Sequence, residues 1–111
     1  MPTAQDKQVI DLIVERLRQT YDPNEIILFG SHARGEVEEW GDIDVIVITD
    51  HHERFIARQR EAALALEDID EDIDVFVYTP DEWQQLNEDY NPFTQSIQAN
   101  HQVLYKKRTK E

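Results

Sequence analysis

The chain has 111 residues, of which 24 are acidic and 11 are basic, so its formal net charge at pH 7 is −13. This length predicts a single domain, residues 1–111, with one modest hydrophobic core. Proteins that bind nucleic acids usually carry basic surfaces, so the strong negative charge argues against direct binding to DNA or RNA. The same charge favours a basic protein partner.

The sequence contains no cysteine, which excludes disulfide bonds and thiolate metal sites and favours the reducing cytoplasm. No apolar run approaches the roughly 18 residues that a membrane-spanning helix requires. Residues 1–6 lack the basic and apolar regions of a signal peptide. We therefore expect a cytoplasmic protein that does not contact a membrane.

The first half of the chain alternates between helical and strand patterns. Apolar residues at helical spacing predict an amphipathic helix over 6–20, and Pro23 in the following turn ends it. Apolar runs over 25–29 and 42–49 predict two buried strands, the second apolar on both faces like a central strand. A further helix is predicted over 52–67. Its inner face is predicted to carry Phe55, Gln59, Ala62, Ala63 and Leu66, and its outer side Arg54, Arg58 and Arg60.

The second half begins with a third predicted strand over 73–78. Thr79 and Glu82 then form the sequence pattern of a capping box, which predicts the start of a helix. A last helix carries Phe93 and Ile97 and ends at Asn100. The segment 103–105 is either a short strand or a packed tail. The aromatic residues expected in the core are Phe55, Trp83 and Phe93.

Two short motifs lie at the junction between the first two predicted strands. Gly30 and Ser31 follow the first strand directly, and Asp42 and Asp44 begin the second, in the pattern Gly-Ser-x10-Asp-x-Asp. Glycine allows the backbone to approach a ligand closely, and backbone N–H groups with the Ser31 hydroxyl can bind phosphate oxygens. Residues two apart on a strand point to one face, so the two carboxylates suit Mg²⁺ together with substrate phosphates.

Connection lengths predict how the strands pair. The short turn between the first two strands favours an antiparallel pair, whereas the helix between the second and third favours a right-handed parallel crossover. The third strand then begins beside Asp42 and Asp44, and Asp74 becomes a third carboxylate at that end of the sheet. We expect an α/β fold, with a small mixed sheet of three to four strands and flanking helices.

The spaced motifs resemble the signature of the nucleotidyltransferase superfamily related to DNA polymerase beta. The closest resemblance is to the MNT group of minimal nucleotidyltransferases, in which a third acid begins a strand that leads into a Thr-Pro helix start. Asp74 followed by Thr79-Pro80 matches this arrangement, and the resemblance covers nearly the whole chain. The chain departs from the family pattern at Gly41, where serine is frequent, and at Asn100, where glycine is common.

The resemblance implies nucleotidyl transfer from ATP with two Mg²⁺ ions. Gly30 and Ser31 would hold the β- and γ-phosphates, and Asp42 and Asp44 would hold Mg²⁺ against the triphosphate. Asp74, with the second metal ion, would help to activate the acceptor hydroxyl. MNT proteins are often antitoxins that transfer AMP to a tyrosine of a HEPN-domain ribonuclease toxin. The implied partner is therefore a HEPN toxin, in a complex with this chain.

Two alternatives to protein adenylylation stay open at this point. In the first, the chain keeps the fold but neutralises its toxin by forming a complex, without catalysis. In the second, it transfers the nucleotide to a small molecule such as an aminoglycoside, although such enzymes usually carry an added helical domain. The role of Asp72, two residues before Asp74, is also open, since the acidic function could be shared between them.

Overall fold

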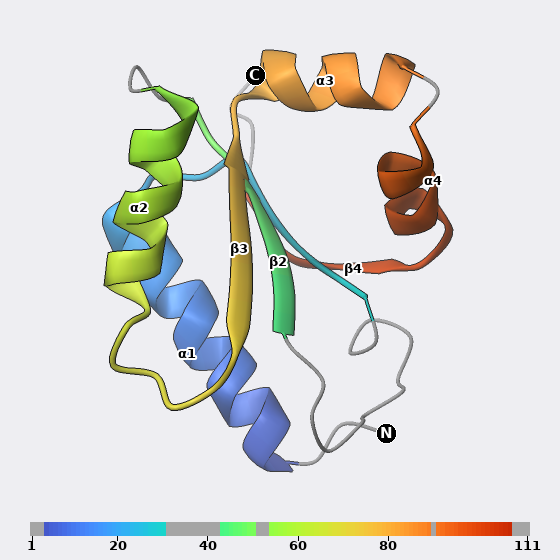
Figure 1. Cartoon of the computed structure of the whole chain (residues 1–111). Helices are drawn as coiled ribbons and strands as arrows, with labels where there is room; N and C mark the ends of the chain where they lie inside the picture. Colours follow the sequence, from blue (N-terminus) through green and yellow to red (C-terminus); the bar gives the residue numbers. More distant parts are fainter. Residues whose placement is uncertain (1–3, 31–42, 51–53, 90, 108–111) are drawn as a thin grey trace.

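The computed structural model describes residues 4–30, 43–50, 54–89 and 91–107. The predicted α/β class is confirmed, and the segment predicted as a strand or a tail is a strand (Figure 1). In chain order the elements are α1 (Ala4–Thr20), β1 (Glu25–Phe29), β2 (Ile43–Ile48), α2 (Phe55–Ala65), β3 (Ile73–Tyr78), α3 (Pro80–Glu88), α4 (Pro92–Ala99) and β4 (His101–Lys106).

The four strands of the described residues form one mixed sheet in the order β3-β2-β1-β4. Strand β1 pairs antiparallel with β2 and with β4, whereas β2 and β3 pair in parallel. Both predicted pairings are confirmed. A parallel pair needs a long connection to return the chain to the same end of the sheet, and α2 provides it here.

Side-chain hydrogen bonds cap the two helices that follow β3. The Thr79 hydroxyl accepts a hydrogen bond from the Glu82 N–H at 3.2 Å, and the Glu82 carboxylate accepts one from the Thr79 N–H at 2.8 Å. The predicted capping box is therefore confirmed. Asn91 caps α4 by accepting a hydrogen bond from the Phe93 N–H at 2.8 Å. These caps fix the starts of α3 and α4.

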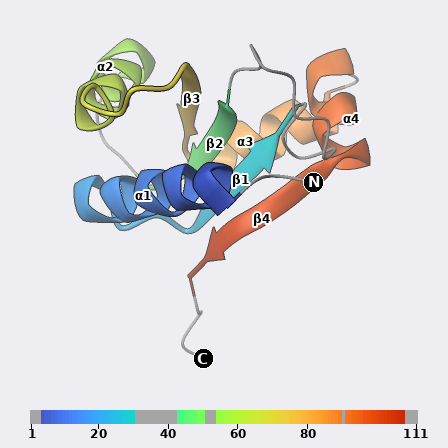
Figure 2. The same ribbon diagram turned by 90° about the horizontal axis from the view of Figure 1, so that it is seen from below.

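Helices α1 and α2 cover one face of the sheet, as the view from below shows (Figure 2). This face holds the larger core because the odd-numbered residues of β2 and β3 point toward it, together with the inner stripe of α1. None of the helices in the described ranges is long and apolar enough to cross a membrane. The buried residues of this core are Ile13, Leu17, Tyr21, Ile26, Leu28, Ile43, Val45, Val47, Ala62, Leu66 and Val77.

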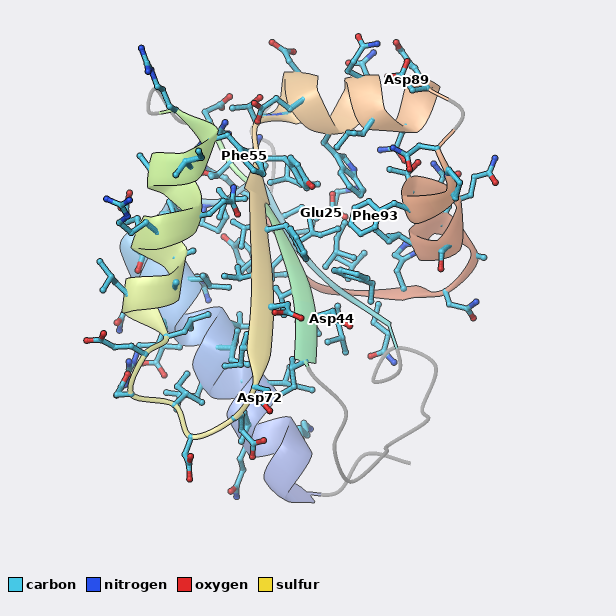
Figure 3. The ribbon with its side chains drawn as sticks, viewed as in Figure 1. Glu25, Asp44, Phe55, Asp72, Asp89 and Phe93 are labelled. Atoms are coloured by element: carbon cyan, nitrogen blue, oxygen red, sulfur yellow. The ribbon has the colours of Figure 1, made fainter. Side chains whose placement is uncertain are left out.

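The opposite face carries a second, smaller core beneath α3 and α4. Its buried members are Ile27, Ile46, Ile48 and Ile97. Phe93 lies between α4 and the strands (Figure 3) and packs against this core, as does Trp83 from α3, so both aromatic residues contribute to it as predicted. Neither is fully buried, and α3 has no fully buried residue.

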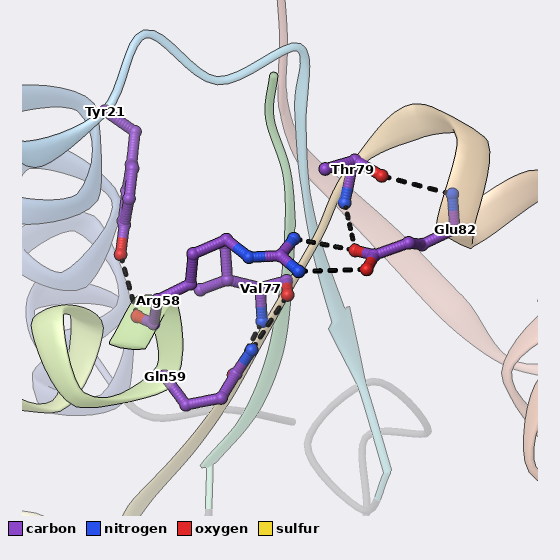
Figure 4. Close-up of polar contacts among 6 residues, drawn as sticks. All are labelled: Tyr21, Arg58, Gln59, Val77, Thr79 and Glu82. Carbon is purple, nitrogen blue, oxygen red and sulfur yellow. Dashed lines mark hydrogen bonds and ion pairs between the residues drawn. The ribbon is translucent and has the colours of Figure 1, made fainter. Parts of the chain in front are cut away.

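The predicted inner face of α2 is partly wrong. Phe55, expected in the core, is 41% exposed, and Ala63 is also exposed, whereas Arg58, expected outside, is only 3% exposed. The Arg58 guanidinium reaches the Glu82 carboxylate of α3 with two hydrogen bonds of 2.6 and 2.9 Å (Figure 4). A partner on another element draws this arginine inward, and helical periodicity contains no information about that partner.

The ion pair changes the protonation of Glu82. Hydrogen bonds from Arg58 stabilise the ionised carboxylate and lower the pKa of Glu82 to about 2, with the Thr79 N–H adding to the effect. The same bonds raise the pKa of Arg58. Because α2 precedes β3 and α3 follows it, this pair fixes the two helices around the end of the strand.

Candidate active site

Two of the three predicted carboxylates lie side by side near the start of the parallel strand pair. Asp44 of β2 and Asp74 of β3 are register partners, so their side chains point to the same face of the sheet. Asp44 is half-buried and Asp74 is exposed. Figure 3 shows Asp44 on β2 and Asp72 just before β3, toward the same end of the sheet. The arrangement that the sequence predicted for Asp44 and Asp74 is therefore present.

Gly30 places the main chain against the Asp44 carboxylate. Its φ of +76° lies in the left-handed region, where residues with a Cβ are strained. A Cβ on Gly30 would lie 3.3 Å from Asp44 Cγ and would overlap Oδ2 of the same carboxylate. Both conformation and space therefore require glycine here. The absence of a side chain lets the Gly30 backbone lie against the Asp44 carboxylate.

An aromatic cluster lies on the same face beside the acids. Phe29 of β1 is the register partner of Asp44 in the β1–β2 pair, whereas Asp74 is its partner in the β2–β3 pair. The ring centroids of Phe29 and Phe93 are 5.7 Å apart, and each ring is also close to Phe76, at 6.1 and 5.9 Å. The edge-to-face geometry of the pairs with Phe93 is a favourable one for aromatic rings. These three rings form an apolar wall next to Asp44 and Asp74.

Sequence reasoning did not assign this aromatic wall to the site. Phe93 was expected in the core, and nothing in the linear sequence connects it with Asp44. Strand alternation offered one usable signal, because Phe29 immediately precedes Gly30 and Phe76 is two residues after Asp74. The signal becomes interpretable only once the register of the three strands is known.

The remaining predicted site residues, Ser31 and Asp42, lie outside the described residues, as does Gly41. Within the described ranges no group of three acidic, histidine or cysteine side chains is gathered closely enough to hold a metal ion. Asp44 and Asp74 are the two predicted metal ligands that this part of the chain contains. Their oxygen-only donor set, with Gly30 leaving space at Asp44, fits a hard cation such as Mg²⁺.

The architecture resembles several solved structures. A toxin–antitoxin complex crystallised with AMP-PNP contains a chain 23% identical to this one, with a TM-score of 0.65, covering 88% of this chain and 73% of that chain. A candidate nucleotidyltransferase from Sulfolobus solfataricus is 19% identical, with a TM-score of 0.63 and coverages of 89% and 78%. A third is the complex of tri-AMPylated Shewanella oneidensis HEPN toxin with MNT antitoxin, at 22% identity, a TM-score of 0.61 and coverages of 91% and 72%.

At these identities the structural matches show a shared fold. No curated protein matches the chain in a sequence search. A sequence-family match gives stronger information, because the family model described as nucleotidyltransferase domain matches residues 10–71. This range includes Gly30 and Asp44, the two described residues that meet at the junction of β1 and β2, and ends before Asp74. Since the match spans more than half of the 111 residues, the chain belongs to the nucleotidyltransferase domain family.

Proposed function

We propose that this chain transfers AMP from ATP to a hydroxyl group of a HEPN-domain ribonuclease toxin and thereby acts as its antitoxin. The proposed acceptor is the hydroxyl of a tyrosine. The observation that carries the proposal is the contact between Gly30 and Asp44, with Asp74 in register beside it. It supports a site in which main chain, able to bind phosphate, directly adjoins carboxylates able to hold a cation.

Three carboxylates are proposed to hold two Mg²⁺ ions. Asp42 and Asp44 would bind both the cation and, through it, the triphosphate, and Asp74 would complete the site on the acceptor side. When bound, magnesium would neutralise the phosphate charge and stabilise the attacking and leaving oxygens of an in-line displacement. Asp44 is suited to this role because it is half-buried between β1 and β3, which restricts its rotamers. Gly30 and Ser31 would orient the β- and γ-phosphates.

The proposed reaction forms one bond and breaks one. The acceptor oxygen attacks the α-phosphorus of ATP, a new O–P bond forms, and the bond from the α-phosphorus to the bridging oxygen breaks. Pyrophosphate carries away that electron pair, and the hydroxyl proton is lost to solvent near Asp74. The wall of Phe29, Phe76 and Phe93 beside the acids offers an apolar surface against which an aromatic acceptor side chain can pack.

The identity of the partner rests on two further observations. Two of the similar structures are toxin–antitoxin complexes, one with AMP-PNP and one in which the HEPN toxin itself carries AMP. The charge of −13 supports a partner with a basic surface, which a ribonuclease needs to bind RNA. Attaching AMP near such a surface adds negative charge there and weakens RNA binding by repulsion.

The experiment is to incubate a purified HEPN partner with this chain, Mg²⁺ and ATP, and then to separate the two proteins. Mass spectrometry is expected to find AMP on a partner hydroxyl, and the separated partner is expected to stay inactive as a ribonuclease. The matched control replaces ATP by a non-hydrolysable α,β-methylene analogue, which can bind but cannot transfer AMP. An unmodified partner that regains ribonuclease activity after separation would instead establish neutralisation by complex formation.

A further inference from the structure

Strand β3 lies at the edge of the sheet formed by the described residues, and its outer side is only partly used (Figure 1). The Ile43 N–H donates to the Asp72 carbonyl and the Thr49 N–H donates to the Tyr78 carbonyl. The even-numbered residues of β3 therefore direct their backbone groups toward β2. The odd-numbered residues, Ile73, Val75 and Val77, direct theirs outward, because backbone groups alternate along a strand.

One of these three outward positions is already occupied. The Gln59 side chain of α2 donates to the Val77 carbonyl and accepts from the Val77 N–H, each at 2.8 Å (Figure 4). A glutamine amide thus takes the place of a neighbouring strand at the end of β3 that is close to α3. At Ile73 and Val75 no side chain of the described residues does the same, so the beginning of β3 has open donors and acceptors.

A pocket of about 260 Å³ adjoins these two open positions. It lies between the end of α2 and β3, and Arg16 of α1 holds its wall in place by bonding to Asp68 and to the Ala65 carbonyl. Ile73 and Val75 are only partly buried, so a further strand could complete the core there. All the charged residues that line the pocket are acidic. The lining consists of Ala63, Leu66, Glu67, Ile69, Glu71, Asp72, Ile73 and Val75.

The opposite edge of the sheet is protected in two ways. Strand β4 has a register irregularity opposite Ile26 and Ile27, and it ends in the charged residue Lys106. Irregular register and edge lysines both discourage an incoming strand. The described part of β3 has a continuous register with β2 and no basic residue. The two edges of one sheet therefore differ in how readily they accept a further strand.

We propose that the outer edge of β3 at Ile73 and Val75 binds an extended, basic segment of another protein as an added strand. Main-chain hydrogen bonds would supply affinity, and the adjoining pocket would accept apolar side chains of the segment.

The charge of the chain determines which kind of segment can bind. A second copy pairing through the same edge would bring Glu71, Asp72 and Asp74 of both chains together, and each chain carries −13. A segment with lysine or arginine side chains would instead be attracted by these acidic residues. The contact is made by the backbone edge of β3, whereas Asp74 belongs to the adjoining face of the same strand.

The test uses the whole chain and a synthetic peptide of alternating lysine and valine residues. Two control peptides are used. In the first, each lysine is replaced by glutamate; in the second, alternate backbone nitrogens are methylated. Fluorescence anisotropy at low salt is expected to show binding of the lysine peptide at least about tenfold tighter than either control, a difference of about 1.4 kcal/mol. Amide hydrogen exchange at Ile73 and Val75 is expected to slow when the lysine peptide binds. Equal binding of the N-methylated peptide, or no binding of any peptide, overturns the proposal.

Two variants separate backbone pairing from charge. Val75→Pro removes an outward N–H without removing a bond to β2 and is expected to weaken peptide binding at least about tenfold. Glu67→Lys with Glu71→Lys reverses charge in the pocket and gives the same loss even if the proline variant does not fold. Asp11→Lys with Glu88→Lys changes total charge equally at exposed positions outside the pocket and is expected to retain binding. Exchange at Val75 that slows with protein concentration alone would identify a second copy as the occupant and overturn the proposal.

Discussion

The two faces of the sheet are built on the same strands, yet helices cover them to different extents. On one face, α1 and α2 bury the odd-numbered residues of β2 from Ile43 to Val47. On the other, α3 and α4 cover Ile46 and Ile48, and the first β2 residue on that face is the half-buried Asp44. The first face is therefore packed along the whole length of β2. The second face is packed at Ile46 and Ile48 and polar at Asp44. Substitutions on both faces test this division, beginning with the largest expected effect.

Asp44→Asn should reduce nucleotidyl transfer by on the order of 1000-fold, because the site loses a charged group at the reacting phosphate. Folding should survive, since asparagine has nearly the same size and removing one carboxylate relieves repulsion with Asp74. Transfer from labelled ATP and thermal unfolding by circular dichroism measure the two effects. Asp50→Asn, an exposed aspartate beyond the other end of β2, is the matched control and should leave transfer unchanged.

The same assay tests which acid near β3 acts with Asp44. If Asp72→Asn abolished transfer and Asp74→Asn left it unchanged, Asp72 and not Asp74 would be the acid that acts with Asp44. The register supports Asp74, because it is the residue paired with Asp44.

Leu17→Ala tests the face that α1 and α2 cover. Leu17 is a fully buried residue of α1, and its truncation should cost about 2–5 kcal/mol in free energy of unfolding. Leu12→Ala, on the same helix but 36% exposed, should cost well below half of that. Urea unfolding gives both values. Equal losses at the two positions would mean that α1 does not pack as described.

Gly30→Ala should cost about 1–2 kcal/mol from its left-handed φ alone, with a further loss from the overlap with Asp44. Combining it with Asp44→Ala removes the overlap and keeps the backbone strain, so the double variant should recover part of the loss. Unfolding free energies of the single and double variants form a thermodynamic cycle. Strict additivity would show that the Gly30 backbone and the Asp44 carboxylate do not meet.

Glu82→Gln should give a distinctive pH dependence. The pKa of Glu82 is about 2 in the folded chain and near its ordinary value of 4.5 when unfolded, so the unfolded state binds the proton more readily. The stabilisation is present above about pH 4.5 and is lost as the pH falls toward 2. The Gln variant should therefore be less stable at neutral pH and should lose less stability on acidification over this interval. Exposure of 40% of the Glu82 side chain allows solvent to screen the pair, but the buried Arg58 guanidinium loses its charged partner in this variant.

Much of the fold could be predicted from local pattern. The boundaries of β1 and β3 agree with prediction, and those of α1 and β2 agree within two residues, because apolar runs and the Thr79 capping box are local signals. Helix α2 is shorter than the predicted 52–67. Its mistaken inner face has a tertiary cause, since Arg58 is buried by Glu82, a residue 24 positions away. Periodicity places residues around a helix axis but does not show where other elements bring an opposite charge.

The sequence by itself determined the family signature and the placement of Asp74 beside Asp44, whereas the contact between Gly30 and Asp44 became visible only in the structure. The sequence did so because motif spacing and the crossover connection depend on few residues. Only the tertiary structure decided that Phe29, Phe76 and Phe93 meet beside the acids and that Gln59 occupies one of the three outward positions of β3. Those contacts join side chains from separate elements. Their existence depends on the strand register and helix placement, which come from packing the whole chain into two cores.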